Sequence, residues 1–187
     1  ALPAGDGSVK FLFALRDGLK VESVLMPGSG NDPEKMTLCV SSQVGCAVDC
    51  KFCVTGANGF FRHMSADEIA GQAMFARRYL RNREESARVL RNLVFMGMGE
   101  PLLNEDAVIQ AIRAMIETGG MDLSPKRITV STSGILPGLE KLAASGIPVG
   151  LAISLNGVTQ AEREEVMPIT RRYQLDDLLD ACRRFPL

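Results

Sequence analysis

Two hydrophobic patterns alternate along most of this chain. Short runs of consecutive apolar residues are separated by longer stretches in which apolar residues recur every three or four positions. The first pattern is typical of β-strands and the second of amphipathic helices, so the alternation predicts an α/β fold with a parallel sheet and right-handed crossovers. The strands expected in this sheet are Met36–Val40, Leu93–Met96, Ile128–Ser131 and Val149–Leu155.

Polar residues mark the points where the intervening helices begin. Ser65 and Thr159 are each followed three positions later by a glutamate, which is the spacing of a capping box. Asn104 and the acidic residues after it predict a further helix start. A shorter helix is expected over Pro137–Ser145. In the last helix, the face expected to be buried consists of Leu175, Leu178, Leu179, Cys182 and Phe185.

The first 35 residues follow a different pattern. Val9–Leu15 and Leu19–Met26 are apolar-rich runs on either side of Asp17-Gly18, a dipeptide suited to a tight hairpin turn. The polar segment Gly28–Lys35 is typical of a loop. We therefore predict an N-terminal β-hairpin with its linker over residues 1–35 and an α/β region over residues 36–187.

The number of strands limits the architecture. The chain has 187 residues, whereas a closed eight-fold barrel needs about 250. Four parallel strands therefore predict an incomplete, partial (β/α) barrel. Because Leu93–Met96 is apolar throughout, we expect a sheet that is covered on both faces.

Composition and charge indicate an ordinary globular protein. Hydrophobic residues make up 46% and charged residues 23%, and the net charge of −1 excludes a uniformly basic surface but allows a local basic patch. No apolar run approaches the roughly 18 residues of a membrane span. Four of the five cysteines fall between Cys39 and Cys53, where a disulfide scaffold would spread them more evenly. This crowding predicts metal or redox chemistry in a reducing compartment, the cytoplasm.

The cysteine-bearing loop predicted over Ser41–His63 contains the strongest chemical signal. Cys46, Cys50 and Cys53 have C-x3-C-x2-C spacing directly after the first parallel strand, at the end of the sheet where α/β active sites gather. A 4Fe–4S cluster normally takes four cysteines, so three would leave one iron open to another ligand. The alternative is a zinc site that adds Cys39 to the three, in a binding module without catalytic activity.

Several further motifs follow in order along the chain. They are Leu38–Cys46, Gly59–Arg62, Met96–Asn104, Thr129–Gly134, Leu151–Leu155 and Val166–Ile169. With the cysteine triad they resemble the radical S-adenosylmethionine (SAM) superfamily, and more narrowly the RlmN/Cfr family of RNA methyltransferases, closest to its RlmN branch. The resemblance runs from about Phe11 to the last residue. Ser41–Gly45 and Gly59–Arg62 argue against a different radical SAM enzyme, such as a glycyl-radical activase or a sulfur-inserting enzyme.

The resemblance implies a fold, a reaction and a set of partners. The fold is a partial (β/α)6 barrel, and the open iron of the cluster binds SAM, whose cleavage yields a deoxyadenosyl radical. The reaction is methylation of carbon-2 of adenine in ribosomal and transfer RNA. An electron donor such as a flavodoxin or ferredoxin is implied, and we expect a monomer.

The resemblance also assigns roles to residues outside the triad. Glu22 matches a position that accepts a proton, and Cys39 matches a cysteine that acts on the covalent RNA adduct and then forms a disulfide with a second cysteine. Asn156 stands where the family often has histidine. Positions that match contacts to SAM are Gly99, Glu100, Ser131, Ser154, Leu155 and Asn156.

In the family, the second cysteine carries the transferred methyl group near the C-terminus, and an N-terminal accessory domain helps to hold RNA. We expect neither the second cysteine nor the accessory domain in this chain, because Cys182 is interpreted as a core residue. The chain is therefore interpreted as the central piece of a longer enzyme, and we expect that it cannot complete turnover alone. His63 is interpreted as a helix-entry residue rather than a ligand. Phe60 and Phe61 could wall a flipped adenine or belong to the core.

One basic stretch could contact RNA. Arg77, Arg78, Arg81, Arg83, Arg88 and Arg91 are offset within the same stretch only by Glu84 and Glu85. Such a cluster could bind phosphates, or it could be the solvated surface of a helix and the loop after it.

Overall fold

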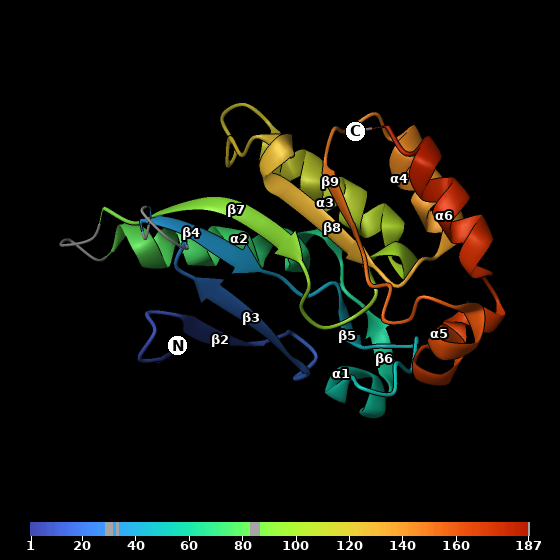
Figure 1. Ribbon diagram of the computed structural model, residues 1–187. Helices are drawn as coiled ribbons and strands as arrows, with labels where there is room; N and C mark the ends of the chain where they lie inside the picture. The colour runs from blue at the N-terminus through green and yellow to red at the C-terminus, as the bar shows by residue number, and fades with distance from the viewer. Residues whose placement is uncertain (29–31, 33, 83–86, 187) are drawn as a thin grey trace.

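Seven strands form one mixed sheet, which is antiparallel at one edge and parallel at the other (Figure 1). The computed structural model describes residues 1–28, 32, 34–82 and 87–186. The antiparallel strands are β1 (Leu2–Pro3), β2 (Val9–Ala14) and β3 (Lys20–Met26), and the parallel strands are β4 (Lys35–Cys39), β7 (Val89–Phe95), β8 (Ile128–Thr132) and β9 (Gly150–Ile153).

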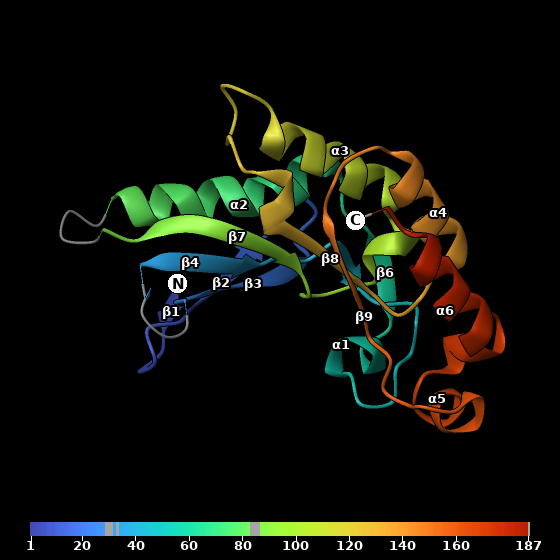
Figure 2. The ribbon, with the colours of Figure 1, turned by 45° about the horizontal axis from the view of Figure 1, so that its top comes forward.

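The strand order β1-β2-β3-β4-β7-β8-β9 leaves β1 and β9 at the edges of the described sheet, so the barrel is open. Both the α/β fold class and the four parallel strands are confirmed. The strands curve around one side of the molecule. Four helices follow one another along its outside, namely α2 (Ala66–Arg81), α3 (Glu105–Ile116), α4 (Leu136–Ala144) and α6 (Leu175–Arg184) (Figures 1 and 2).

The predicted hairpin is confirmed, because β2 and β3 pair antiparallel with Leu12 opposite Glu22. Gly18 makes the turn possible, since its φ of +83° is a conformation that most residues avoid. The hairpin then pairs with β4, with Val24 opposite Cys39. The predicted boundary between the two units, at residues 35 and 36, therefore falls inside β4, in a sheet that both units share. The division into two units stays a prediction. Residues 29–31 and 33 of the predicted linker lie outside the described residues.

The helices begin largely where polar residues predicted. Ser65 Oγ accepts the backbone N–H of Glu68 at 3.2 Å, and Thr159 Oγ1 accepts that of Glu162 at 3.3 Å, so both capping boxes are confirmed. The α-helices are α1 (Val54–Ala57), α2 (Ala66–Arg81), α3 (Glu105–Ile116), α4 (Leu136–Ala144), α5 (Gln160–Val166) and α6 (Leu175–Arg184), and the 3-10 helices are Pro101–Leu103, Pro125–Arg127 and Pro168–Arg171.

Asn104 occupies the N-cap position of α3 without capping it through its side chain. Its Nδ2 instead donates to the carbonyls of Ser42 and Met64, both at 2.8 Å. The helix start was therefore predicted correctly, but the side chain binds the segment that carries the cysteines. A buried amide with two carbonyl acceptors on another segment is a strong positional restraint.

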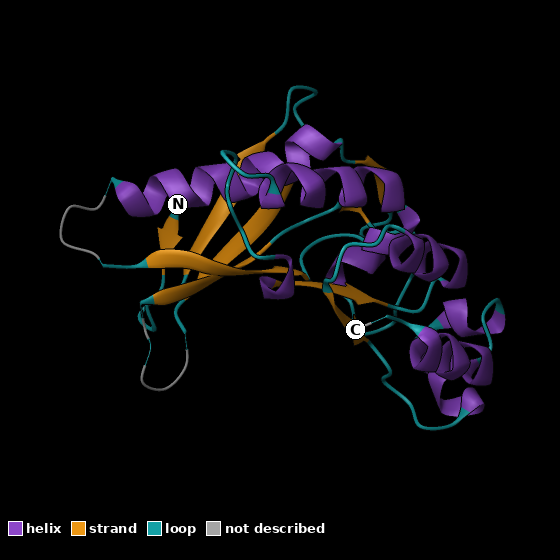
Figure 3. Cartoon of the chain, turned by 90° about the horizontal axis from the view of Figure 1, so that it is seen from above, coloured by secondary structure: helices purple, strands orange, loops and turns teal. Residues whose placement is uncertain are grey.

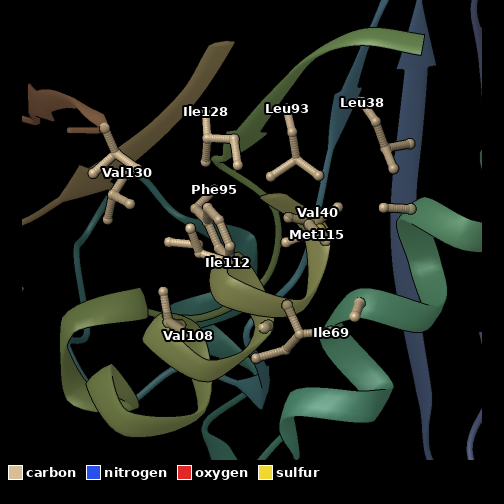
Figure 4. Close-up of a cluster of buried hydrophobic side chains, with 14 of the residues drawn as sticks. Leu38, Val40, Ile69, Leu93, Phe95, Val108, Ile112, Met115, Ile128 and Val130 are labelled. Atoms are coloured by element: carbon tan, nitrogen blue, oxygen red, sulfur yellow. The ribbon is translucent and has the colours of Figure 1, made fainter. Parts of the chain in front are cut away.

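The main core lies between the sheet and the helices outside it (Figure 3). Figure 4 shows side chains from β4, β7 and β8 meeting those of α2 and α3, with Phe95 close to Ile112. Burial alternates along the strands: Ile128, Val130 and Thr132 of β8 are buried, whereas the residues between them are half-buried. The expectation of a sheet covered on both faces is therefore wrong, because helices cover the outer face and the inner face stays partly open.

The segment Ser41–His63 contains more structure than the predicted loop. It holds α1 and two short strands, β5 (Gln43–Gly45) and β6 (Phe60–His63), which pair antiparallel with Gln43 opposite His63. The Gln43 Nε2 and His63 Nδ1 atoms lie 3.1 Å apart. His63 thus ends a strand just before the first turn of α2. The pairing of β5 with β6 holds together the two ends of the cysteine-bearing segment.

Arg62 connects β6 to the distant hairpin turn and to the start of α2. Its Nη1 and Nη2 donate to the Glu68 carboxylate at 2.8 and 2.9 Å, and its Nε donates to Asp17 in the hairpin turn. The Arg62 guanidinium lowers the pKa of both carboxyl groups. One side chain therefore holds the hairpin turn, β6 and the start of α2 together.

Replacing Arg62 with alanine is expected to lower the free energy of unfolding at neutral pH by about 1 kcal/mol, the scale of a solvent-screened bidentate pair. Because Arg62 depresses the pKa of Asp17 and Glu68, the stabilisation is present above their unfolded pKa values and lost as pH falls through the folded ones. Urea unfolding at neutral and acidic pH measures this. Arg171→Ala, whose exposed side chain lies 3.9 Å from Glu164, is the control. Equal stability of wild type and Arg62→Ala at neutral pH would contradict the expectation.

Candidate active site

The carboxyl ends of the parallel strands surround a cavity of about 330 Å³. Its lining comes from the cysteine segment after β4, the turn after β7, the end of β8 and Ser154 after β9. Parallel strands all end at the same edge of a sheet, which is why loops far apart in the sequence meet there. The cavity lies at the edge that the sequence predicted.

Cys46, Cys50 and Cys53 all line this cavity as partly buried free thiols. The loop turns tightly, because the backbone N–H of Cys53 donates to the Cys50 carbonyl at 3.0 Å. The N–H of Lys51 donates to the carbonyl of Val166 at 2.9 Å, which ties the loop to the end of α5. The three thiols are thus held against one cavity by contacts from both sides of the loop.

Burial weakens the acidity of two of these thiols. It raises the pKa of Cys46 and raises that of Cys50 to about 11, with smaller contributions from negative charge on neighbouring cysteines and on Glu100. Burial therefore favours the neutral form of the Cys46 and Cys50 thiols. Cysteines bind metals as thiolates, so occupation of this site is coupled to the release of protons.

The loop can approach β6 this closely only because residue 45 is glycine. Gly45 has a φ of +77°, and a Cβ there would lie 2.0 Å from the Gly59 carbonyl oxygen. Cys46 follows directly, and its N–H donates to that same carbonyl at 3.0 Å. The glycine therefore sets the position of the first cysteine.

Gly45→Ala is expected to destabilise the protein more than Gly59→Ala. Both glycines have positive φ, +77° and +78°, but a Cβ at Gly59 has no atom within 4 Å. Gly59→Ala should thus cost only the backbone term of about 1–2 kcal/mol, and Gly45→Ala that term plus the clash. Chemical denaturation of the two variants measures the difference. Equal losses would show that the close contact is not needed.

Three hydrogen bonds hold the buried carboxylate of Glu100. Its carboxylate accepts hydrogen bonds from the Leu102 N–H at 2.9 Å, Thr132 Oγ1 at 2.7 Å and the Ser133 N–H at 2.7 Å. Only 4% of the residue is exposed, and burial raises the pKa of its carboxyl group. The carboxylate therefore joins the turn after β7 to the end of β8, in the wall of the cavity.

A buried glutamine holds the start of the cysteine segment. Gln72 of α2 accepts the N–H of Ser41 at 2.9 Å and donates to its carbonyl at 2.8 Å, as a neighbouring strand would. The Ser41 hydroxyl donates to the Glu22 carbonyl at 2.6 Å and accepts the Met98 N–H at 2.9 Å. Gln72 lies in the helix that was predicted to begin after Ser65, but only the fold shows that its side chain faces this segment.

The structure brings most of the predicted site residues to the cavity. Besides the three cysteines, the lining includes Gly99, Glu100, Ser131 and Ser154. Leu155 and Asn156 lie just beyond Ser154 and are not part of the lining. The Asn156 side chain instead contacts Met167 Sδ at 3.4 Å.

Two predicted catalytic residues lie outside the lining. Cys39 ends β4 as a free, partly buried thiol whose pKa is raised by burial. Glu22 lies on β3, where its carboxylate accepts Lys10 Nζ at 2.9 Å and both side chains are 45% exposed. Cys182 packs against the core from α6, as expected, although Ala181 is more deeply buried there than Leu179.

Sequence reasoning missed one residue of the cavity lining and the buried arginine that is hydrogen-bonded to it. Ser133 lines the cavity and is 5% exposed, and its Oγ has no hydrogen-bond partner among the described residues. Arg163 is 1% exposed and donates to the carbonyls of Ser133 and Leu155 and to the hydroxyl of Thr170. No pattern distinguished this arginine from the charged residues around it in α5.

The donor set fits an iron–sulfur cluster. Three thiols face one cavity beside an unpartnered buried hydroxyl. Within the described ranges, no three Cys, His, Asp or Glu side chains are arranged to hold a single metal ion. Each thiolate on a cluster binds a different iron, so its ligands need not converge on one point. The zinc alternative requires Cys39 beside the triad, whereas the structure keeps Cys39 out of the lining.

These features define a partial barrel with three cysteine thiols that could bind an iron–sulfur cluster at the carboxyl ends of its strands. Comparison with known proteins points to the same class of protein. The sequence matches the radical SAM superfamily over residues 40–186. The chain therefore belongs to the radical SAM superfamily.

Within this superfamily, the chain is similar to several RNA methyltransferases and to one methyltransferase of known structure. The chain is 50% identical over 98% of its length to the "Dual-specificity RNA methyltransferase RlmN" of Syntrophobacter fumaroxidans, covering 51% of that protein, and 48% identical over 97% of its length to that of Geobacter sulfurreducens, covering 47%. It also resembles the crystal structure of a radical SAM methyltransferase from Sphaerobacter thermophilus, with a TM-score of 0.91, 42% identity, and coverage of 98% of this chain and 52% of that one. The chain spans about half the length of these relatives.

Proposed function

We propose that this chain is the radical SAM core of an RNA methyltransferase that acts on carbon-2 of adenine in ribosomal and transfer RNA. The observation that carries the proposal is the cavity, which gathers Cys46, Cys50 and Cys53 with the turn at Gly99-Glu100. The identity to RlmN proteins supports the choice of reaction. As the resemblance implies, the methyl group would pass through a methyl-cysteine and a covalent RNA adduct.

The three thiolates would hold a 4Fe–4S cluster, which would bind SAM at its open iron and supply the electron for SAM cleavage. Around that site, Glu100 keeps the turn after β7 in place through its hydrogen bonds to Thr132 and Ser133. The unpartnered Ser133 hydroxyl is available to a polar group of the bound cofactor. Val48 and Phe95 contribute apolar lining that limits access of water.

Residues outside the cavity complete the proposal. Cys39 and Glu22 would act on the RNA adduct, as a thiol that forms a disulfide and as a proton acceptor, which requires RNA to reach β3 and β4. Phe60 and Phe61 are 42% and 62% exposed, so they are not core and could pack against an extruded base. A flavodoxin or ferredoxin would supply electrons in the cytoplasm. None of the described helices is long and apolar enough to cross a membrane.

The two levels of the proposal are tested separately. The chain, reconstituted anaerobically with iron and sulfide, is expected to convert SAM to 5′-deoxyadenosine when dithionite is added. Absence of this product from a protein that holds about four irons would contradict the radical SAM step. For the RNA, deletion of the gene that encodes this chain should remove 2-methyladenosine from ribosomal and transfer RNA. Unchanged 2-methyladenosine would contradict the assigned substrate.

A further inference from the structure

A groove lined by arginines lies at the end of the sheet opposite the cysteine cavity. Its volume is about 300 Å³, and its walls come from the last turns of α2, the start of β7 and the segment before β8. Figures 1 and 2 show these ends far from α1 and β6, which follow the three cysteines in the chain. The arginines in its lining are Arg77, Arg81, Arg88, Arg91 and Arg127.

Positive charge exceeds negative charge in this groove. Asp122 is the one carboxylate in its described lining. Arg81, Arg91 and Arg127 are exposed, and no ion pair joins any of them to a carboxylate in the part of the chain that the structure describes. Arg83, Glu84 and Glu85 of the basic stretch lie outside that part.

The shape of the groove is held by one of its own arginines. Arg77 Nη1 donates to the carbonyls of Gly120 at 3.4 Å and Met121 at 2.9 Å, which fixes the connection between α3 and β8 against α2. This connection forms one wall of the groove. Arginine pairs with phosphate through two parallel N–H donors, and a fixed wall keeps such donors oriented.

An adjoining depression adds an aromatic surface. It shares Arg77 and Arg81 with the groove and is also lined by Phe75, whose side chain is 46% exposed. Phe75 contacts Phe11 and Phe13 edge to face, with 5.3 Å between ring centroids in each pair, so the ring is held in place. Arginines beside an exposed aromatic ring match the backbone and bases of single-stranded nucleic acid better than an acidic peptide.

We propose that this arginine groove binds phosphates of the RNA backbone, as a contact separate from the cysteine cavity. The inference rests on the proposed function for the choice of RNA as the partner. β7 runs from the groove to the cavity, and its seven residues span about 20 Å at about 3.3 Å each. An RNA with its reactive base in the cavity would cross that distance along the protein surface.

The test replaces Arg81, Arg91 and Arg127 together with glutamine, which removes three exposed charges. Binding of a labelled single-stranded RNA of about 12 nucleotides to the whole chain is followed by fluorescence anisotropy at several salt concentrations. We expect the Kd at about 0.1 M salt to rise about tenfold or more and the log–log salt slope to fall by about two, since each phosphate contact contributes about 0.7. Glutamine replacement of Arg16, Arg171 and Arg184, exposed arginines outside the groove, is the matched control and should change neither quantity as much.

Three results would overturn the inference. The first is equal loss of RNA binding in the groove variant and the control. The second is loss of inorganic pyrophosphate binding in the groove variant without loss of RNA binding, which would indicate a site for small phosphate compounds. The third is a larger loss of polyglutamate binding than of RNA binding. SAM cleavage should be unchanged in the groove variant. If the groove does not bind RNA, the proposed function therefore still stands. That function is tested separately, by SAM cleavage in the wild-type protein.

Discussion

Replacing Cys46, Cys50 or Cys53 with alanine is expected to leave the protein without a stable cluster and without SAM cleavage. Each thiol lines the same cavity, and a cluster left with two cysteine ligands has lost one of the three bonds that fix it. Iron and sulfide content and the yield of 5′-deoxyadenosine measure the effect. Both should fall to background in each single variant.

Two other cysteines provide matched controls. Cys39→Ala and Cys182→Ala remove partly buried free thiols that do not line the cavity. Both variants should keep about four irons, and Cys182→Ala should also keep SAM cleavage. Loss of iron in Cys39→Ala to the same extent as in the triad variants would instead favour a four-cysteine site.

Arg163→Ala is expected to lower the free energy of unfolding by about 3 kcal/mol, because it leaves three acceptors unpaired, two of them in buried hydrogen bonds. The acceptors are the Ser133 and Leu155 carbonyls and the Thr170 hydroxyl. Ser133 lines the cavity, so the same change should weaken SAM binding in the loaded protein. Urea unfolding of the chain and the KM for SAM measure the two effects.

Two further variants separate the effect of losing the charge of Arg163 from the effect of losing its hydrogen bonds and from the effect of replacing any arginine. Arg163→Lys keeps the charge, but its three donors sit on one nitrogen and cannot reach the three acceptors that the guanidinium reaches from three nitrogens, so its loss of stability should be intermediate. Arg184→Ala, at an exposed position on α6, should change stability by less than about 0.5 kcal/mol. A loss in Arg163→Ala no larger than in Arg184→Ala would show that the buried guanidinium is not needed.

Features fixed by neighbouring residues were predictable from the sequence. The capping boxes at Ser65 and Thr159 depend on residues three positions apart, and both were found. The cysteine triad and the turn at Gly99-Glu100 lie directly after predicted strands, and the parallel arrangement brought them to one edge. Local pattern and topology therefore predicted where the three cysteines would lie, whereas Glu100, Ser131 and Ser154 were assigned through the family resemblance.

Features that depend on pairs distant in the sequence were missed. β5 and β6 are short and meet across the whole cysteine loop, so neither has enough residues to show a period. The Asn104 side chain does not cap α3, because its amide donates hydrogen bonds to two buried carbonyls of another segment. Arg163 looks like a surface residue in α5 until the turns after β8 and β9 fold over it.

The most direct measurement of the central claim is electron paramagnetic resonance of the reduced, anaerobically reconstituted chain, recorded with and without SAM. Three cysteine ligands predict a 4Fe–4S signal that changes when SAM is added, because SAM binds the iron that lacks a protein ligand. A protein that takes up one zinc and no iron, or a cluster signal that SAM leaves unchanged, would contradict the account.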